Sequence, residues 1–240
     1  MDEIRQSAAE ALRGNPYPGR GILIGRSEDG NKAIYAYFIM GRSENSRNRV
    51  FEMAGGALYT RPFDESKVTD PSLIIYPAMR RVGDRILVTN GDQTDTIADA
   101  LAAGGDFFSA LETRTYEPDA PNYTPRISAM LDLAGADPLC AMSILRRRAD
   151  GSCERARFTY SSQAGVGRLL HTYVTDGDPL PSFVGEPKEV AIRGSADELA
   201  TALWDALDPN NRISLCVGEV DLATGDVTHR ILNKHERSEK

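Results

Sequence analysis

The chain has few of the side chains that build metal sites or disulfide frameworks. It contains three cysteines and three histidines among 240 residues. The cysteines are odd in number and show no CxxC spacing, and the histidines show no metal-ligand spacing. The sequence therefore predicts neither a disulfide framework nor a metal site, and it fits a reducing cytoplasm. These residues are Cys140, Cys153, Cys216, His171, His229 and His235.

Several signatures of common enzyme and membrane classes are also missing. There is no GxSxG elbow, no P-loop and no GxGxxG after a strand, so the usual hydrolase and nucleotide-binding motifs are absent. No apolar run approaches the length of a membrane span, and the segment from Met1 to Gln6 does not look like a signal peptide. The net charge of -7 disfavours a nucleic acid or an anionic membrane as partner.

What remains is an ordinary globular composition, with 41% hydrophobic and 26% charged residues. Many short apolar runs are separated by turn signals, and they do not alternate regularly with helical patterns. This favours a single α+β domain over residues 1–240 with largely antiparallel sheets. We expect a helix over Asp2–Arg13 and a frayed tail over 234–240. Residues 175–188 are rich in glycine and proline and are expected to form a loop, which could serve as a lid.

The expected strands and helices follow from periodicity and capping signals. The strands are Gly21–Gly25, Ala33–Met40, Val50–Met53, Ala57–Tyr59, Leu73–Tyr76, Pro77–Val82, Arg85–Thr89, Ile127–Leu133, Leu139–Arg147, Ala156–Ser161, Arg168–Val174, Ile213–Val220 and Val227–Leu232; the later helices are Thr94–Ala103, Phe107–Glu112 and the one that the capping box at Ser195 begins.

The stretch Tyr116–Ile127 is the first candidate for the wall of an active site. Its three prolines exclude a helix, yet it holds Glu117, Asn122 and Arg126 within a few positions. A stiff loop that presents a carboxylate, an amide and a guanidinium suits positioned chemistry. The alternative is a surface connection with scattered charges.

A second candidate is the arginine-rich segment between two expected strands. This segment contains Arg42, Arg47, Asn48 and Arg49. One guanidinium group can donate two parallel hydrogen bonds to two oxygens of a phosphate or carboxylate. Arg26 adds a further cation if the preceding strands pair. The alternative is a solvated hairpin tip.

Two further stretches carry weaker signals. Asn90-Gly91-Asp92 joins a strand to a helix, which is a common layout for a ligand loop, although Asp92 could also simply cap the helix. Tyr76 lies on an apolar strand, where a core position is the alternative to a hydroxyl that faces a pocket.

Taken together and in order, these stretches resemble the archaeal-type IMP cyclohydrolase family. The resemblance extends over about Gly19–Leu133, and a helical extension over residues 1–15 and a longer Arg42–Arg49 segment depart from the family pattern. Its motifs here are Gly21–Arg26, Arg42-Ser43 with Asn48-Arg49, Tyr76 with Arg80–Asp84, Thr89–Ile97, Tyr116–Asp119 and Thr124–Ile127.

The resemblance implies a four-layer αββα sandwich like that of the N-terminal nucleophile hydrolases, without their nucleophile. It also implies ring closure of 5-formamidoimidazole-4-carboxamide ribotide (FAICAR) to IMP with loss of water, the last step of de novo purine synthesis. Both reacting groups belong to one molecule, so no cofactor is needed. Family members tend to assemble, which implies a homo-oligomer.

The implied roles fall on residues already singled out. Arg49, Tyr76 and Glu117 are the expected catalytic residues: Arg49 binds phosphate or polarises the carboxamide, Tyr76 donates to the formyl oxygen, and Glu117 accepts the amide proton. Two other classes stay open, a purine-nucleotide sensor without catalysis and an amide hydrolase. The expected substrate-binding residues are Arg26, Arg42, Asn48, Asn90, Asp92, Asn122 and Arg126.

Overall fold

The computed structural model describes residues 5–68, 71, 74–135 and 137–235, and these residues form two antiparallel sheets with a few helices. The α+β expectation is confirmed. The first sheet has the order β11-β10-β1-β2-β12-β13, and the second runs from β3 to β9 in chain order. The strands of the first sheet are β1 (Arg20–Arg26), β2 (Lys32–Met40), β10 (Val166–His171), β11 (Lys188–Ala191), β12 (Arg212–Asp221) and β13 (Val227–Asn233). Those of the second are β3 (Val50–Ala54), β4 (Ala57–Arg61), β5 (Tyr76–Val82), β6 (Arg85–Thr89), β7 (Arg126–Asp132), β8 (Leu139–Arg147) and β9 (Cys153–Ser161).

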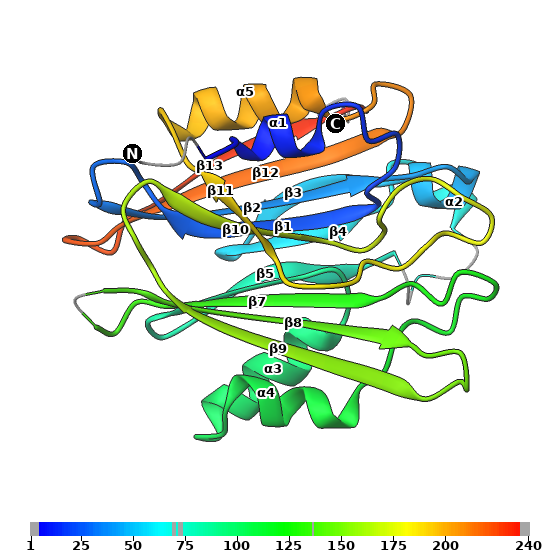
Figure 1. Cartoon of the computed structure of the whole chain (residues 1–240), viewed down its shortest axis with the longest axis horizontal. Coiled ribbons are helices and arrows are strands. Elements are labelled where there is room, and N and C mark those ends of the chain that lie inside the picture. The colour runs from blue at the N-terminus through cyan, green and yellow to red at the C-terminus, as the bar shows by residue number, and fades with distance from the viewer. Residues whose placement is uncertain (1–4, 69–70, 72–73, 136, 236–240) are drawn as a thin grey trace.

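The two sheets stack face to face, and helices cover their outer faces (Figure 1). α1 and α5 lie on the first sheet, and α3 and α4 lie on the second. Short 3₁₀ turns occupy Glu65–Lys67 and Leu111–Thr113. The α-helices are α1 (Ala8–Leu12), α2 (Glu44–Arg47), α3 (Gln93–Ala102), α4 (Phe107–Ala110) and α5 (Ala196–Ala206).

Strand β2 shows why a run of apolar residues can form a central strand. Successive side chains point to opposite faces, so Tyr35 and Tyr37 enter the core between the sheets. Ala36 and Phe38 enter the core under α1 and α5. Because both faces of β2 are covered, its sequence is apolar almost without alternation.

The N-terminal helix is shorter than the expected Asp2–Arg13. The Ser7 hydroxyl accepts from the Glu10 N–H, and the Glu10 side chain accepts from the Ser7 N–H, so this capping box begins α1 at Ala8. Before it, the Gln6 carbonyl accepts a hydrogen bond of 2.9 Å from Ala191 in β11. Arg5 and Gln6 are therefore outside the helix, and the first three residues of the expected range, 2–4, lie outside the described part of the chain.

Four other expectations need correction. The polar segment after β2 contains α2, which Ser43 caps. Strand β11 was not foreseen, and it begins at Lys188, the last residue of the expected loop. β10 ends at His171 rather than at Val174, and β5 begins only at Tyr76, so Ile74 and Ile75 precede the strand.

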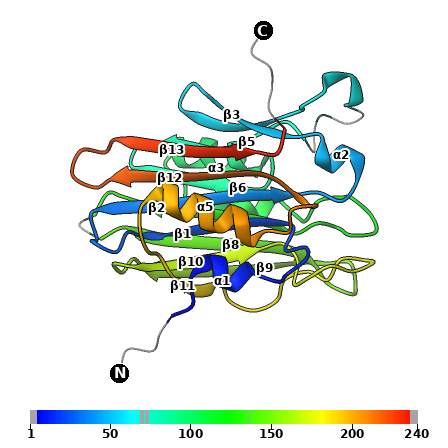
Figure 2. The ribbon, with the colours of Figure 1, turned by 90° about the horizontal axis from the view of Figure 1, so that it is seen from above.

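The C-terminal strand is fastened to the second sheet. Figure 2 shows β3 beside β13, and the Asn233 side chain bonds both the N–H and the carbonyl of Phe51, at 2.8 and 3.0 Å. Lys234 is held to the first sheet, because its N–H donates to the carbonyl of Ile213 in β12 at 2.8 Å. The remainder of the expected frayed tail, residues 236–240, lies outside the described part of the chain.

Candidate active site

A cavity of about 270 Å³ opens where the start of β1, the end of β2 and the loop before β7 meet. Arginine, carboxylate and tyrosine side chains dominate its wall. The lining residues are Tyr17, Arg20, Met40, Arg42, Ser43, Asn45, Ser46, Arg49, Glu117, Asp119, Asn122, Thr124, Tyr173 and Leu180.

Two arginines line the cavity: Arg49 is buried, and the side chain of Arg20 is 12% exposed. Arg20 Nε and both Nε and Nη1 of Arg49 are buried, and within the described residues none has a hydrogen-bond partner. Burial lowers the pKa of Arg49, and the neighbouring charge of Arg20 lowers it further. Buried guanidinium nitrogens without partners are costly, so their presence in two residues that line a cavity favours an anionic or oxygen-rich occupant.

Glu117 is the carboxylate of this cluster and is only 3% exposed. Its Oε2 lies 3.9 Å from Arg20 Nη2, and its backbone N–H donates to the Thr124 carbonyl at 2.9 Å. Burial raises the pKa of Glu117, although the nearby Arg20 and Arg126 act in the opposite direction. A buried carboxyl group with a raised pKa beside two guanidinium groups is suited to exchange protons with a substrate.

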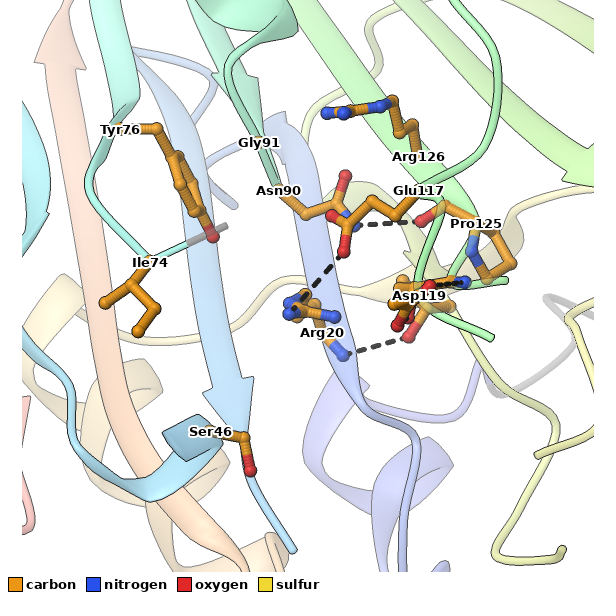
Figure 3. A network of polar contacts seen from close by, with 12 residues as sticks. Arg20, Ser46, Ile74, Tyr76, Asn90, Gly91, Glu117, Asp119, Pro125 and Arg126 are labelled. Atoms are coloured by element: carbon orange, nitrogen blue, oxygen red, sulfur yellow. Dashed lines mark hydrogen bonds and ion pairs between the residues drawn. The ribbon is translucent and has the colours of Figure 1, made fainter. Parts of the chain in front are cut away.

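Tyr76 is buried behind the arginines and is not among the residues that line the cavity. Its hydroxyl lies 2.9 Å from that of Tyr37, and its N–H donates to Thr60 Oγ1 at 3.2 Å. In Figure 3 the Tyr76 hydroxyl and the Glu117 carboxylate both point toward the region of Arg20. Of the three expected catalytic residues, the structure thus places Arg49 and Glu117 in the lining of one cavity and Tyr76 outside that lining.

The loop before β7 keeps its shape through polar contacts inside the wall. The Asp119 carboxylate accepts from the Thr124 N–H at 2.6 Å and also from the Thr124 hydroxyl. That hydroxyl lies 2.6 Å from the Tyr173 hydroxyl, which therefore donates to it. Asn122 accepts a 3.1 Å hydrogen bond from the Leu180 N–H, so the loop is joined to the segment after β10.

Arg42 lies at the rim of the cavity. Its guanidinium pairs with Asp176, donates to the Gly177 carbonyl at 3.0 Å and lies 5.0 Å from the centre of the Tyr17 ring. These contacts hold the 175–188 segment against the mouth of the cavity.

Arg26 is not at this site, and the register of the hairpin explains why. Arg20 pairs with Ile39 at the end of β2 where the arginine-rich segment begins, whereas Arg26 pairs with Ala33 at the opposite end. Arg26 Nη1 instead forms an ion pair of 2.7 Å with Asp137. In an antiparallel hairpin, the first residue of β1 is the one that meets the exit of β2.

The amides of Asn48 and Asn90 bind the backbone rather than face the cavity. Asn48 Nδ2 donates to the Asp64 carbonyl at 2.8 Å, and Asn48 Oδ1 accepts from the Asp64 N–H at 2.7 Å. Asn90 Nδ2 donates to the Pro125 carbonyl at 2.9 Å, and its Oδ1 accepts from the Ile127 N–H at 2.8 Å. Asn90 thereby fixes the end of the loop that carries Glu117.

Asp92 and Arg126 form their own pair, away from the cavity lining. Arg126 Nη1 donates to Asp92 Oδ1 and to Gln93 Oε1, each at 2.7 Å. Figure 3 shows the Arg126 guanidinium directed toward Gly91.

Arg20 and Tyr173 are the principal site residues that sequence reasoning missed. Arg20 lies next to Gly21, where a Cβ would come within 2.1 Å of the Phe38 ring. The two glycines around Arg20 were therefore a signal in the sequence that the start of this strand is closely packed. Tyr173 follows β10, and nothing in its local sequence connects it with a loop fifty residues earlier.

The described residues hold no group of three or more His, Cys, Asp or Glu side chains that could bind a metal ion. His171 is buried, its Nδ1 lies 2.7 Å from the Tyr173 carbonyl, and burial lowers its pKa to about 4.

No helix in the described part of the chain is long and apolar enough to cross a membrane.

Comparison with known proteins adds independent evidence. The chain is 39% identical over 120 residues to an IMP cyclohydrolase of Methanopyrus kandleri, which is 48% of this chain and 59% of the relative. It is 33% identical over 134 residues to one of Methanothrix thermoacetophila, covering 51% of this chain and 65% of the relative. The matched region thus spans about three fifths of these relatives. A family model described as IMP cyclohydrolase-like protein matches residues 17–224. The chain therefore belongs to the IMP cyclohydrolase-like family.

Proposed function

We propose that the protein is an IMP cyclohydrolase, which closes FAICAR to IMP with loss of water. The observation that carries this proposal is a cavity lined by the buried Glu117 and by two arginines, Arg20 and Arg49, with nitrogens that have no hydrogen-bond partner within the described residues. The family assignment and the names of the relatives support the same reaction. The substrate is then a purine ribotide.

The reaction asks for position and proton transfer rather than for a protein nucleophile. The carboxamide nitrogen of FAICAR attacks the formyl carbon and forms the new C–N bond. The nitrogen loses a proton and the former formyl oxygen gains one to become a hydroxyl. The C–O bond then breaks and the hydroxyl leaves as water, while the former formamido nitrogen gives up the second proton and forms the C=N bond of the purine ring. Holding both groups in attack geometry removes much of the entropic barrier.

The cavity residues fit these steps. Glu117 accepts the proton of the carboxamide nitrogen, and its raised pKa also suits it to return a proton to the departing hydroxyl. Arg20 and Arg49 bind the phosphate or the oxygen on which negative charge develops. Tyr76 lies outside the cavity lining with its hydroxyl 2.9 Å from that of Tyr37, and its proposed donation to the formyl oxygen requires the substrate to reach past the lining residues.

The other expected site residues take supporting roles in this proposal. Arg42 and Asn122 hold the 175–188 segment over the substrate, which makes that segment a lid. Asn48, Asn90, Asp92 and Arg126 hold the elements that carry Arg49 and Glu117. Arg26 has no role in substrate binding here, because it lies at the far end of β1.

The stacked layers of helices and sheets support the finer fold assignment, a four-layer αββα sandwich of the N-terminal nucleophile hydrolase type (Figure 1). Fold alone does not give the chemistry, and the proposed reaction uses no N-terminal nucleophile. We also propose a cytoplasmic homo-oligomer in which residues 1–240 act as a single domain.

Turnover of FAICAR tests the proposal. Purified protein is incubated with FAICAR, and IMP is followed by chromatography against a buffer control. The proposal expects IMP formation well above buffer. A rate equal to that in buffer would contradict it, and IMP binding by the same preparation would then identify a nucleotide sensor.

A further inference from the structure

A second hollow lies on the other side of the loop that carries Glu117. It has a volume of about 430 Å³, and Arg114, Tyr116, Pro118, Tyr123 and Arg126 contribute to its wall. Tyr116 and Pro118 face this hollow, whereas Glu117 and Asp119 face the active cavity. Successive side chains of an extended segment point to opposite sides, so one short loop forms a wall of both spaces.

Positive charge exceeds negative charge at the base of the second hollow. Arg114 and Arg126 share Asp92: Arg126 Nη1 lies 2.7 Å from Asp92 Oδ1, and Arg114 pairs with Oδ2. One carboxylate therefore faces two guanidinium groups. Arg114 Nε is buried and has no hydrogen-bond partner within the described residues. A buried donor without a partner is costly, so an anion bound beside Arg114 would be stabilised by this guanidinium.

Two half-buried tyrosine rings form the apolar part of the wall. Tyr116 and Tyr123 meet edge to face with their centres 5.7 Å apart. The Tyr116 hydroxyl donates to the Gly151 carbonyl at 2.8 Å, and the Arg147 guanidinium lies 4.5 Å from the centre of the Tyr123 ring. These contacts fix both rings, which offers a preformed surface to a planar group.

We propose that this hollow is a second binding site, which takes a phosphorylated ligand with a planar ring, such as a nucleoside monophosphate. Arg114 and Arg126 bind the phosphate, and Tyr116 and Tyr123 contact the ring. Binding here does not depend on the proposed function of the active cavity. The consequence for catalysis does depend on it: because Tyr116 is adjacent to Glu117, a ligand in the hollow contacts the loop that positions the proton acceptor.

Calorimetric titration with AMP tests the site. AMP can also enter the active cavity, so the informative quantity is the difference between wild type and Arg114→Gln. Loss of hydrogen bonds to a charged group weakens binding by about tenfold or more. We expect Arg114→Gln, and independently Tyr116→Leu, to lose one equivalent of bound AMP, while adenosine without its phosphate binds at least tenfold more weakly to wild type.

Arg230→Gln is the matched control, because Arg230 is an exposed arginine of β13 paired with Asp197. It should bind AMP as wild type does, and thermal unfolding should show that all three variants are folded. No AMP binding by wild type, or unchanged stoichiometry in the folded Arg114→Gln and Tyr116→Leu variants, would overturn the site.

The link to catalysis has a separate test, which rests on the proposed function. We expect AMP to change the apparent KM for FAICAR about fivefold or more in wild type and Arg230→Gln, and much less in Arg114→Gln. Equal inhibition of wild type and Arg114→Gln would show competition in the active cavity and would refute the link, while the binding result would stand on its own.

Discussion

Replacing Glu117 by glutamine removes the charge of the proposed proton acceptor with little change in shape. Glutamine keeps the backbone hydrogen bond to Thr124 and fills the same buried volume. It cannot accept the carboxamide proton. Removing a general base lowers a rate by a factor of about 10² to 10⁴, which corresponds to about 3–5 kcal/mol of barrier.

The structure gives a reason to expect a rate loss within that range, because no other carboxylate in the described part of the chain is well placed to act as the proton acceptor. Among the described residues that line the cavity, Asp119 is the other carboxylate. Both of its oxygens already accept from Thr124, so Asp119 is poorly placed to replace Glu117. We therefore expect kcat to fall at least about 100-fold, with a small change in KM.

Initial rates of IMP formation measure this effect, with circular dichroism and thermal unfolding as checks on folding. Glu154→Gln is the matched control, because Glu154 lies on β9 outside the cavity lining and pairs with Arg146 at 2.6 Å. It should keep wild-type turnover. A folded Glu117→Gln variant within about threefold of wild type in kcat would refute the proton-transfer role.

Four further predictions follow from named contacts. Arg49→Lys keeps the charge but loses the guanidinium fork, and steady-state kinetics should show a KM for FAICAR raised about tenfold or more. kcat/KM should fall as the pH is lowered through the pKa of Glu117, because only the ionised form accepts a proton; since burial raises that pKa above 4.5, a pH–rate profile should place the loss at higher pH than for an exposed glutamate. Thr124→Val removes the hydroxyl between Asp119 and Tyr173, and urea unfolding should show a loss of about 1–3 kcal/mol. Gly218→Ala places a Cβ 2.1 Å from the Tyr35 ring and should cost about 1–3 kcal/mol in the same assay, whereas Gly135→Ala should change stability by less than about 0.5 kcal/mol.

Local patterns in the sequence were enough for most strands and for the loop before β7. The apolar run of β2 and the turn signals around it define its hairpin with β1, because these signals act between neighbouring residues. The same patterns missed α2 and overextended α1, because side-chain caps at Ser43 and Ser7 decide where those helices begin. β11 is a short strand whose existence depends on pairing with β10.

The composition of the site was harder to predict from local sequence patterns, because it depends on which strand ends lie next to each other in the folded chain. Arg20 and Arg26 occupy the two ends of β1, and only the hairpin register shows which of them joins Arg49. Tyr173 reaches the cavity through packing against Thr124, a contact between distant parts of the chain. Glu117 could be predicted from the sequence, because the prolines around it indicate a stiff loop.

The crystal structure of the protein with IMP is the most direct test of the central claim, that the cavity lined by Arg20, Arg49 and Glu117 holds the purine ribotide. We predict IMP in this cavity, with an oxygen of the nucleotide within hydrogen-bond distance of Arg20 Nε or Arg49 Nη1 and the purine ring beside Glu117. IMP bound elsewhere, or an empty cavity at IMP concentrations that saturate the protein in solution, would contradict the account.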